Sequence, residues 1–413
     1  MIIMRNVDDA PLPRLAGRSL ADRLQVMPAV VLTGARQTGK STLVQNLVPR
    51  GRRYFSLDEL DVLDAARRDP EALVGGTQPV TLDEVQREPD LLRAVKRAID
   101  RRRRPGQFLL TGSANLLLMR QVSESLAGRA SHLTLWPMTR REQRGLGRSG
   151  LWEELLKARD DEWIDVLSAF KPREPEDWRA LARRGGFPTP AVHLRTARER
   201  AVWFDGYVRT YLERDLQDLS SIAALPDFHR LMRAACLRLG QLVNQTELGR
   251  DVALQQPTVY RYLNLLETSY LLVRLPAYSV NRTKRLIKSP KLYWGDTGVA
   301  LHLGGAEPGG AHLENLVLND LLAWRDARLD RAEVLYWRTA VGEEVDLVIE
   351  ADGRLLPIEV KTTSRPRLTD AAHLRTFRAE YGRQARAGLL LHTGSTLEWL
   401  ATGVLAAPWW TVL

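Results

Sequence analysis

Cysteine is almost absent from this chain: Cys236 is the single one among 413 residues. One cysteine excludes an intramolecular disulfide and suits a reducing compartment. Because Cys236 lies in the apolar helical pattern LMRAACLRL, we expect it to be a small core residue rather than a nucleophile.

Long hydrophobic runs are also missing. No apolar stretch approaches the ~18 residues that a membrane span needs, so we expect no transmembrane helix. The segment Met1–Pro13 carries acids and prolines and lacks the basic and apolar regions of a secretory signal. These absences favour a cytoplasmic protein without a membrane partner.

Lysine is scarce as well, since only eight of the 60 basic residues are lysines. The net charge of +10 and the isoelectric point near 9.9 suit a polyanionic partner such as DNA. A genome-wide arginine bias explains the same numbers, so the charge permits nucleic-acid binding without demanding it. No repeat with a period of about 20–50 residues is visible, which argues against solenoids and propellers.

The apolar patterns divide the chain into four parts. A length of 413 residues predicts roughly two to four domains. Alternating strands and helices are typical of an α/β domain, and this pattern occurs at both ends of the chain. We expect an α/β multidomain protein with a first α/β domain (1–145), a helical connector or lid (146–205), a small helical module (206–290) and a second α/β domain (291–413). The strands expected in the first domain are Ala29–Thr33, Tyr54–Leu57, Val80–Asp83 and Phe108–Thr111.

A glycine-rich loop follows the first of these strands. Residues 34–41 read GARQTGKS, the G-x-x-x-x-G-K-[ST] pattern, between a buried strand and a helix. Such a loop turns its backbone N–H groups towards phosphates at a helix N-terminus. Lys40 would reach the β- and γ-phosphates of ATP, and the Ser41 hydroxyl would bind Mg²⁺. The expected nucleotide-binding residues are Gly34, Ala35, Arg36, Gln37, Thr38, Gly39, Lys40, Ser41 and Thr42.

Acidic and small polar residues end two further strands. The segment 79–84, PVTLDE, predicts that Asp83 holds Mg²⁺ through water and that Glu84 orients or activates the attacking water. The strand Phe108–Thr111 leads to Ser113, which we expect to sense the γ-phosphate. A helix cap for the following segment is the alternative role of Ser113.

Two arginine features have two interpretations each. Arg129, in SLAGR, is either a phosphate-contacting arginine acting in cis or across a subunit interface, or a plain surface residue. The run Arg101–Arg104 predicts a solvated loop, with nucleic-acid contact as the alternative.

The middle module carries a helix–turn–helix pattern. Asn244 to Glu247 form a capping-box pattern for a helix to Val252, and Pro257 suits the first turn of a second helix to about Glu267. With a strand pair at Tyr270–Leu275, this is the geometry of a winged helix. A small bundle that contacts only proteins is the alternative. Leu248, Val252, Val259, Leu263 and Leu266 would be buried, while Gln256, Thr258, Tyr260 and Arg261 would face outward.

A group of charged residues follows in the second α/β domain. Two strands, 343–349 and 355–361, are joined by an Asp352-Gly353 turn, which predicts a hairpin. Glu359 and Lys361 share one face, and Asp346 joins them from across the hairpin. Two carboxylates and a lysine can bind Mg²⁺ and activate water against a phosphodiester. A solvated charged edge is the alternative. A helix (313–326) would precede the hairpin, together with a strand (334–338). A helix (369–381) and a strand (386–391) would follow it.

With these motifs the chain resembles a family of bacterial and archaeal AAA-type ATPases that carry a C-terminal domain of unknown function. The resemblance covers nearly the whole chain and includes the segments GARQTGKST, TLDEVQ, LTGSANLLL, SLAGR, YLERDL, SPKLYWGDTG, HLENLVLNDL, EEVDLVIE and IEVKT. It implies an ASCE-type P-loop fold, a winged-helix element and a restriction-endonuclease-like PD-(D/E)xK domain. Glu314, Asp346, Glu359 and Lys361 then fall on the nuclease motif positions.

Three functions remain open from the sequence. The first is a DNA-acting ATPase for remodelling, translocation or branch processing, with a Mg²⁺-dependent nuclease attached. The second is an ATP-switched DNA- or protein-binding protein whose nuclease-like domain is only a platform. The third is a signalling ATPase that acts on proteins. ATP and Mg²⁺ are the expected cofactors, and the class of ATPase also allows a homo-oligomer or ring.

Overall fold

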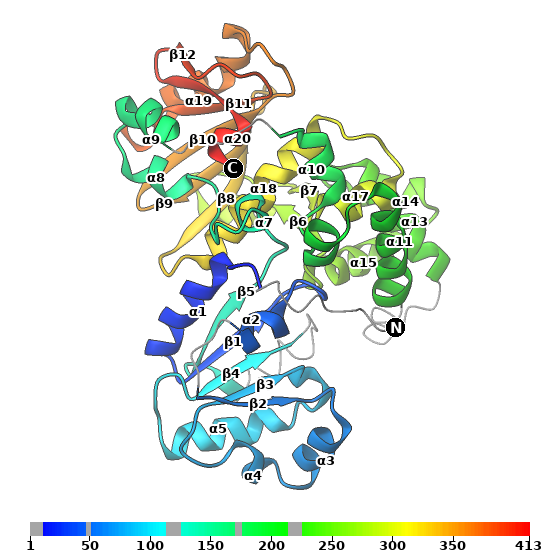
Figure 1. The fold of residues 1–413 in the computed structure, drawn as a ribbon. Helices are drawn as coiled ribbons and strands as arrows, with labels where there is room; N and C mark the ends of the chain where they lie inside the picture. Colours follow the sequence, from blue (N-terminus) through cyan, green and yellow to red (C-terminus); the bar gives the residue numbers. More distant parts are fainter. Residues whose placement is uncertain (1–10, 47–50, 113–124, 170–175, 214–224) are drawn as a thin grey trace.

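The computed structural model describes residues 11–46, 51–112, 125–169, 176–213 and 225–413 (Figure 1). In these ranges no helix is both long enough and apolar enough to cross a membrane. The N-terminal sheet, the middle helices and the C-terminal sheet occupy separate regions of the molecule in Figure 1.

The N-terminal domain is built on a five-stranded parallel sheet with the order β2-β3-β4-β1-β5. Strand β4 therefore lies between β1, which leads into the phosphate loop, and β3, which ends in the acidic pair. The strands are β1 (Ala29–Thr33), β2 (Arg53–Ser56), β3 (Val80–Asp83), β4 (Phe108–Thr111) and β5 (Ala130–Thr134), and the helices are α1 (Leu15–Val26), α2 (Lys40–Asn46), α3 (Leu60–Arg68), α4 (Pro70–Val74) and α5 (Leu91–Arg101).

Both faces of this sheet are buried, as expected for a parallel sheet with helices on each side. Successive side chains of a strand point to opposite faces. Ala29 and Val31 thus belong to the core beneath α3, α4 and α5, whereas Val30 and Leu32 pack with α1 and α2. This explains why β1 reads as a continuous apolar run.

The middle module has a helix–turn–helix followed by a small sheet. Helices α13 (Leu225–Leu237), α14 (Gln245–Asp251) and α15 (Gln256–Thr268) precede the antiparallel strands β6 (Leu272–Leu275) and β7 (Lys291–Trp294). The segment before α14 pairs with β7 through a bridge between Leu242 and Lys291. The five residues expected to be buried in the two helices all are. Among the outward four, Gln256, Tyr260 and Arg261 are exposed and Thr258 is half-buried.

The predicted strand pair at Tyr270–Leu275 was wrong in one respect. Only β6 comes from that segment, and its partner β7 lies beyond a 15-residue excursion, residues 276–290. The boundary expected at residue 290 therefore cuts through a sheet, because β7 belongs with β6. Helix α17 (Thr297–Gly304) also packs against α13, so the C-terminal domain begins at α18 (Gly310–Ala327).

The C-terminal domain has a six-stranded mixed sheet with the order β12-β13-β11-β10-β9-β8. The predicted hairpin is confirmed: β9 and β10 are antiparallel, and Asp352 and Gly353 both have positive φ, as a tight hairpin turn requires. The elements are β8 (Ala332–Arg338), β9 (Glu344–Ala351), β10 (Arg354–Val360), α19 (Ala372–Tyr381), β11 (Gly388–His392), β12 (Glu398–Ala401), β13 (Val404–Pro408) and α20 (Trp409–Val412).

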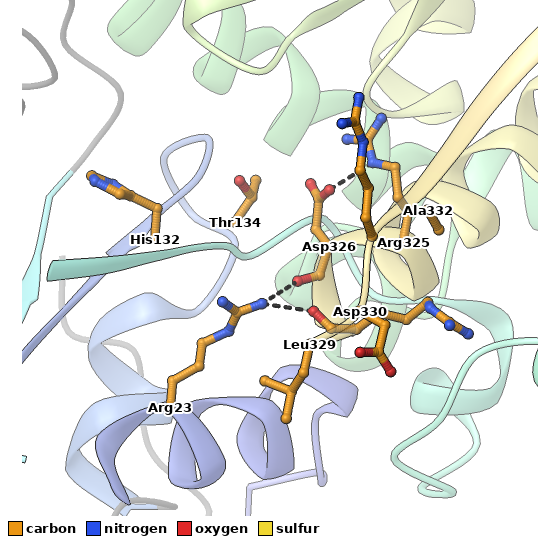
Figure 2. Close-up of a pocket in the computed structure, with 10 residues that line it drawn as sticks. Arg23, His132, Thr134, Arg325, Asp326, Leu329, Asp330 and Ala332 are labelled. Carbon is orange, nitrogen blue, oxygen red and sulfur yellow. Dashed lines mark hydrogen bonds and ion pairs between the residues drawn. The ribbon is translucent and has the colours of Figure 1, made fainter. Parts of the chain in front are cut away.

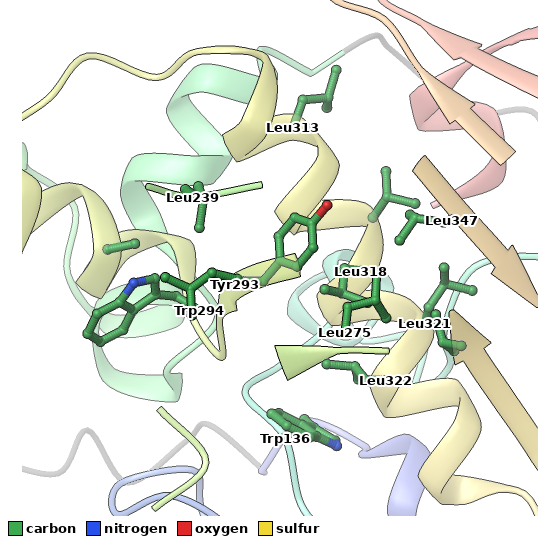
Figure 3. Packing of buried hydrophobic residues seen from close by; sticks show 14 of the residues in the cluster. Trp136, Leu239, Leu275, Tyr293, Trp294, Leu313, Leu318, Leu321, Leu322 and Leu347 are labelled. Carbon is green, nitrogen blue, oxygen red and sulfur yellow. The ribbon is translucent and has the colours of Figure 1, made fainter. Parts of the chain in front are cut away.

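One hydrophobic core runs from the middle module into the C-terminal domain. Figure 3 shows Tyr293 and Trp294 of β7 beside leucines of α18, with Leu347 of β9 on the far side. All the connector helices except the first contribute to this core, and the fully buried Trp152 and Trp163 belong to it. The connector helices are α7 (Arg140–Gln143), α8 (Trp152–Lys157), α9 (Trp163–Ala169), α10 (Trp178–Arg184) and α11 (Ala197–Tyr207).

Helix α1 joins the N-terminal domain to the C-terminal domain. Arg23 donates hydrogen bonds to the carbonyls of Arg328 at 2.7 Å and Asp326 at 3.4 Å (Figure 2). At the other end of α1, Arg14 donates to the carbonyl of Thr38 at 2.7 Å. The same helix thus contacts the phosphate loop and the C-terminal domain.

Candidate functional site

The phosphate loop has the backbone that its glycines predict. Gly34 and Gly39 have φ values of 148° and 91°, and Gln37 is left-handed at 65°. A Cβ on Gly34 would lie 2.3 Å from the Leu135 carbonyl oxygen, so only glycine fits there. Helix α2 begins at Lys40, directly after the loop, and the N–H groups of a helix N-terminus can bind phosphates.

Lys40 is buried against its own loop. Its Nζ donates to the carbonyl oxygens of Gly34 at 3.2 Å and Ala35 at 2.9 Å. Burial lowers the pKa of Lys40 to about 8, although the nearby Glu84 and Asp83 carboxylates oppose the shift. An incoming phosphate would replace the carbonyl partners and favour the charged ammonium.

Asp83 is held by two neighbouring strands. The Tyr54 hydroxyl on β2 donates to Asp83 Oδ2 at 2.7 Å, and the Thr111 hydroxyl on β4 donates to Oδ1. These two donors keep the carboxylate in one orientation at the carboxyl end of β3. Glu84 follows with a left-handed φ of 59° and accepts a hydrogen bond from the Gln86 amide. A non-glycine residue in this conformation is uncommon and frequently marks a functional site.

This site fits Mg²⁺ bound together with a nucleotide. Magnesium usually takes one or two carboxylates, several waters and the phosphates of its substrate, rather than a cage of protein ligands. Asp83 offers such a carboxylate, since two hydroxyl donors leave lone pairs unused. Ser41, in the first turn of α2, offers the hydroxyl.

Several residues outside the predicted site hold the loop in place. Arg14 contacts the loop at the Thr38 carbonyl and pairs with Glu142 at 3.0 Å. The Tyr207 hydroxyl lies 3.4 Å from the Arg36 carbonyl. Each comes from a distant part of the sequence, so no local motif marks it.

The predictions for Arg129, Ser113 and Arg101–Arg104 have different outcomes. Arg129 is not near the phosphate loop of its own chain: it precedes β5 at the amino edge of the sheet and pairs with Asp100 at 2.6 Å. The contact in cis is therefore wrong, because the loop lies at the opposite, carboxyl edge; a contact across a subunit interface stays a prediction. Ser113 lies outside the described residues. Arg101–Arg104 are mostly exposed, as a solvated loop requires.

The second site lies where β7, α18, β9 and β10 meet. Asp346 accepts a hydrogen bond from the Val360 N–H at 2.9 Å, and Lys361 Nζ lies 2.6 Å from Glu359 Oε1. The hairpin thus brings Asp346, Glu359 and Lys361 together as the alternation predicted. Glu314 reaches the same cluster from α18.

Lys291 is the residue that the sequence analysis did not foresee here. Its ammonium lies 2.5 Å from Glu344 Oε1, 3.2 Å from Glu314 Oε1 and 3.7 Å from Asp346 Oδ1. Its side chain is only 3% exposed. Burial alone would lower the pKa of Lys291, but the three carboxylates together raise it above its usual value. An ammonium therefore occupies the centre of the carboxylates.

Two glutamates in this cluster have pKa values above the usual range. Burial and the Asp346 carboxylate raise the pKa of Glu314 and that of Glu359 to about 8. The Tyr293 hydroxyl also donates to Glu314. Glu359 Oε2 is buried without a hydrogen-bond partner among the described residues.

The ammonium of Lys291, rather than a metal ion, pairs with three carboxylates of this cluster. Among the described residues no group of three or more His, Cys, Asp or Glu side chains is arranged to hold one. Lys291 already supplies a positive charge to Glu314, Glu344 and Asp346. We therefore do not assign the expected Mg²⁺ to Asp346 and Glu359.

Two further features fall outside both sites. Cys236 is buried, and burial raises the pKa of its thiol well above the usual value, which confirms a core residue. A cavity of about 280 Å³ lies between the N- and C-terminal domains, where Figure 2 shows His132, Thr134 and Arg325 around Arg23 and Asp326. Burial, and then the nearby Arg23, lower the pKa of His132.

Comparison with known proteins identifies parts of the chain. Residues 27–143 match the model of an AAA domain, residues 175–309 match a domain of unknown function (DUF8612), and residues 309–412 match another (DUF4143). The uncharacterized protein Rv2008c of Mycobacterium tuberculosis is 34% identical over 367 residues, which cover 86% of this chain and 75% of that protein. The uncharacterized protein Mb2031c of Mycobacterium bovis matches to the same extent. The chain belongs to the family of these mycobacterial proteins.

Within this family the N-terminal part of the chain is an AAA-type P-loop ATPase domain. An uncharacterized protein of Haemophilus influenzae is 23% identical over 329 residues, 71% of this chain and 74% of that protein. Among solved structures, the Walker-type ATPase PabY2304 of Pyrococcus abyssi is 19% identical, with a TM-score of 0.44, over 72% of this chain and 99% of that chain.

Proposed function

We propose that this P-loop ATPase uses ATP to switch its hold on DNA, and that its C-terminal domain is a nuclease-like platform that does not cut. The observation that carries the proposal is a contact between the phosphate-loop strand and the middle module. Thr33, the residue before the loop, lies with its hydroxyl 2.8 Å from the Tyr270 hydroxyl. Nucleotide-dependent movement of the loop would therefore reach the module directly.

At the nucleotide site, the residues divide the work of hydrolysis. The loop N–H groups and Lys40 would bind the phosphates, and Glu84 would orient the attacking water. Asp83 and Ser41 would hold Mg²⁺, which neutralises charge on the phosphates when bound. Tyr54 and Thr111 would keep Asp83 in the orientation that this role needs.

The middle module supports DNA as the substrate. A helix–turn–helix places its second helix in a groove of DNA, with side chains near the start of that helix on the bases. Here α15 exposes Gln256, Tyr260 and Arg261 at its start, and the whole chain carries a net charge of +10. Polar and cationic side chains on this face suit base edges and phosphates.

The carboxylate cluster favours the platform over the nuclease. Metal-assisted hydrolysis needs an open site with a divalent ion, whereas Lys291 fills the centre of this cluster. Removing Lys291 would leave the carboxylates of the cluster without their cation. The role of this ammonium is therefore to stabilise the folded protein. A role in positioning DNA without cleavage remains for the domain.

The test measures ATP turnover with linear, single-stranded and branched DNA, with Lys40→Ala as the control. We expect turnover to rise with one DNA form and Lys40→Ala to abolish it. In the same samples, DNA cleavage should not exceed that of Asp346→Ala. Unchanged turnover with every DNA form would overturn the DNA role, and cleavage that depends on Asp346 would overturn the platform role.

A further inference from the structure

A short exposed segment between β6 and β7 combines cations and aliphatic side chains. We call residues 280–288, which include α16 (Arg282–Ile287), the α16 arm. Leu286, Ile287 and Val280 are 86%, 78% and 72% exposed. Arg282, Lys284 and Lys288 are exposed beside them. In the part of the chain that the structure describes, no ion pair is formed by any of these three cations.

The arm is nevertheless held firmly at one point. Arg285 is buried, pairs with Glu333 at 2.7 Å and with Glu350, and donates to the Ser279 carbonyl at 2.7 Å. Its guanidinium also lies 4.7 Å from the centre of the Tyr278 ring. A single inward arginine thus fixes the segment while its neighbours face solvent.

Local hydrogen bonds shape the arm further. The Asn281 side chain accepts from the Thr283 N–H at 2.9 Å and caps α16. Before the arm, the Tyr278 N–H donates to the Tyr336 carbonyl at 2.5 Å, which attaches this part of the excursion to β8. An element ordered in advance loses less conformational entropy when a partner binds.

The position of the arm points to the same partner as α15. It leaves the small sheet that follows the helix–turn–helix, so one module carries both α15 and the arm. Free cations suit the phosphates of a duplex, where each contact releases counterions. Aliphatic side chains such as leucine and isoleucine insert between base steps in the minor groove and kink the DNA.

We propose that the α16 arm binds double-stranded DNA, with Arg282, Lys284 and Lys288 on phosphates and Leu286 and Ile287 against a base step. The proposal rests on the proposed DNA function and adds a second contact to that of α15. The polar face of α15 in the same module favours DNA over an anionic lipid surface, which the test includes as an alternative.

The experiment measures binding of the full chain to a fluorescein-labelled duplex by anisotropy over a series of salt concentrations. The triple variant Arg282→Ala, Lys284→Ala, Lys288→Ala should bind at least about 10-fold more weakly. Its plot of log affinity against log salt should be shallower by about 2–3, since each lost phosphate contact removes about 0.9 from the slope. The double variant Leu286→Ser, Ile287→Ser removes the aliphatic side chains of the arm without changing its charge. It should bind DNA more weakly, with an unchanged slope of log affinity against log salt.

A second readout separates a wedge from a general apolar contact. Energy transfer between dyes at the two ends of the duplex reports bending, and the serine variant should bend DNA less at saturating protein. Two control variants change exposed residues of the N-terminal domain instead. The triple variant Arg67→Ala, Arg68→Ala, Arg93→Ala matches the loss of three cations. The double variant Val26→Ser, Leu60→Ser matches the loss of two aliphatic side chains. These controls should match the unmodified protein.

The outcomes distinguish the arm from the proposed function. If the unmodified protein binds and is stimulated by DNA but the arm variants behave like the controls, the arm proposal is overturned and the DNA function stands. If the unmodified protein binds no duplex, both fail. If the arm variants lose binding to vesicles of phosphatidylcholine and phosphatidylglycerol while keeping that to DNA, the partner is a lipid surface and the proposal is overturned.

Discussion

The Lys291 ammonium lies 3.2 Å from the Glu314 carboxylate and joins β7 of the middle module to α18 of the C-terminal domain. Glu344 and Asp346 surround the same ammonium from β9. This buried ion cluster therefore ties the C-terminal domain to the module that carries α15.

Replacing Lys291 with methionine should destabilise the protein strongly. The change leaves buried carboxylates without a cation, which typically costs about 3–5 kcal/mol. Urea unfolding followed by tryptophan fluorescence would measure the loss. Lys284→Met, an exposed lysine, is the matched control and should change stability by less than about 0.5 kcal/mol. Adding Glu344→Gln to Lys291→Met should recover part of the loss, because the Glu344 carboxylate lies 2.5 Å from the ammonium that is removed; equal effects of the two lysine variants would contradict the ion cluster.

Tyr54→Phe should slow ATP hydrolysis without abolishing it. The variant removes the donor that lies 2.7 Å from Asp83 Oδ2, while the Thr111 hydroxyl stays. A lost hydrogen bond of about 1 kcal/mol corresponds to a roughly fivefold lower kcat. Steady-state turnover at saturating ATP checks this, with Tyr260→Phe on the exposed face of α15 as control. A kcat equal to that of the control would show that Asp83 needs no second donor.

Tyr270→Phe should weaken the communication between nucleotide and DNA. The variant keeps the ring beside Trp136 but removes the hydroxyl that contacts Thr33. We expect basal ATP turnover to persist, and the stimulation by DNA to fall about fivefold, as the loss of about 1 kcal/mol of coupling implies. Turnover with and without DNA gives both values. If DNA stimulated ATP turnover of the variant fully, the contact between Tyr270 and Thr33 would not be the route of coupling.

Asp320 should make stability depend on pH. Its Oδ1 accepts from the Gly150 N–H at 2.7 Å and the Trp152 indole N–H at 2.6 Å, and burial raises its pKa to about 6. Between about pH 4 and pH 6, Asp320 therefore stays protonated in the folded state, whereas it is ionised in the unfolded state. The stability contributed by this proton is present at low pH and is lost as pH rises through about 6.

Asp320→Asn removes this dependence. Between pH 4 and 7, the free energy of unfolding of the unmodified protein should fall by up to about 3 kcal/mol relative to that of the variant. This follows because the pKa of Asp320 is roughly two higher in the folded state than in the unfolded state. Urea unfolding at several pH values measures the difference, and Asp330→Asn, an exposed aspartate, is the control. A constant difference across this range would show that Asp320 is charged in the folded protein below pH 6.

Local patterns predicted the elements whose signals are contiguous. The strands Ala29–Thr33, Val80–Asp83 and Phe108–Thr111 were found with their observed bounds, because each is an apolar run between polar turns. Strand β5 was missed, since ASHLT alternates with polar residues and has only one buried position. Its partner β1 lies about a hundred residues earlier, and no local signal carries that pairing.

The sequence by itself determined the phosphate loop, the acidic pair and the charged hairpin. Their chemistry depends on residues that are close in the chain, so spacing alone places glycines at strained turns and carboxylates on one face of a strand. Only the tertiary structure decided which partners surround them. It brought Lys291 to Glu314, Tyr270 to Thr33 and Tyr54 to Asp83, and it put Arg129 at the far edge of the sheet. Such contacts follow from the packing of distant elements, which side-chain periodicity does not encode.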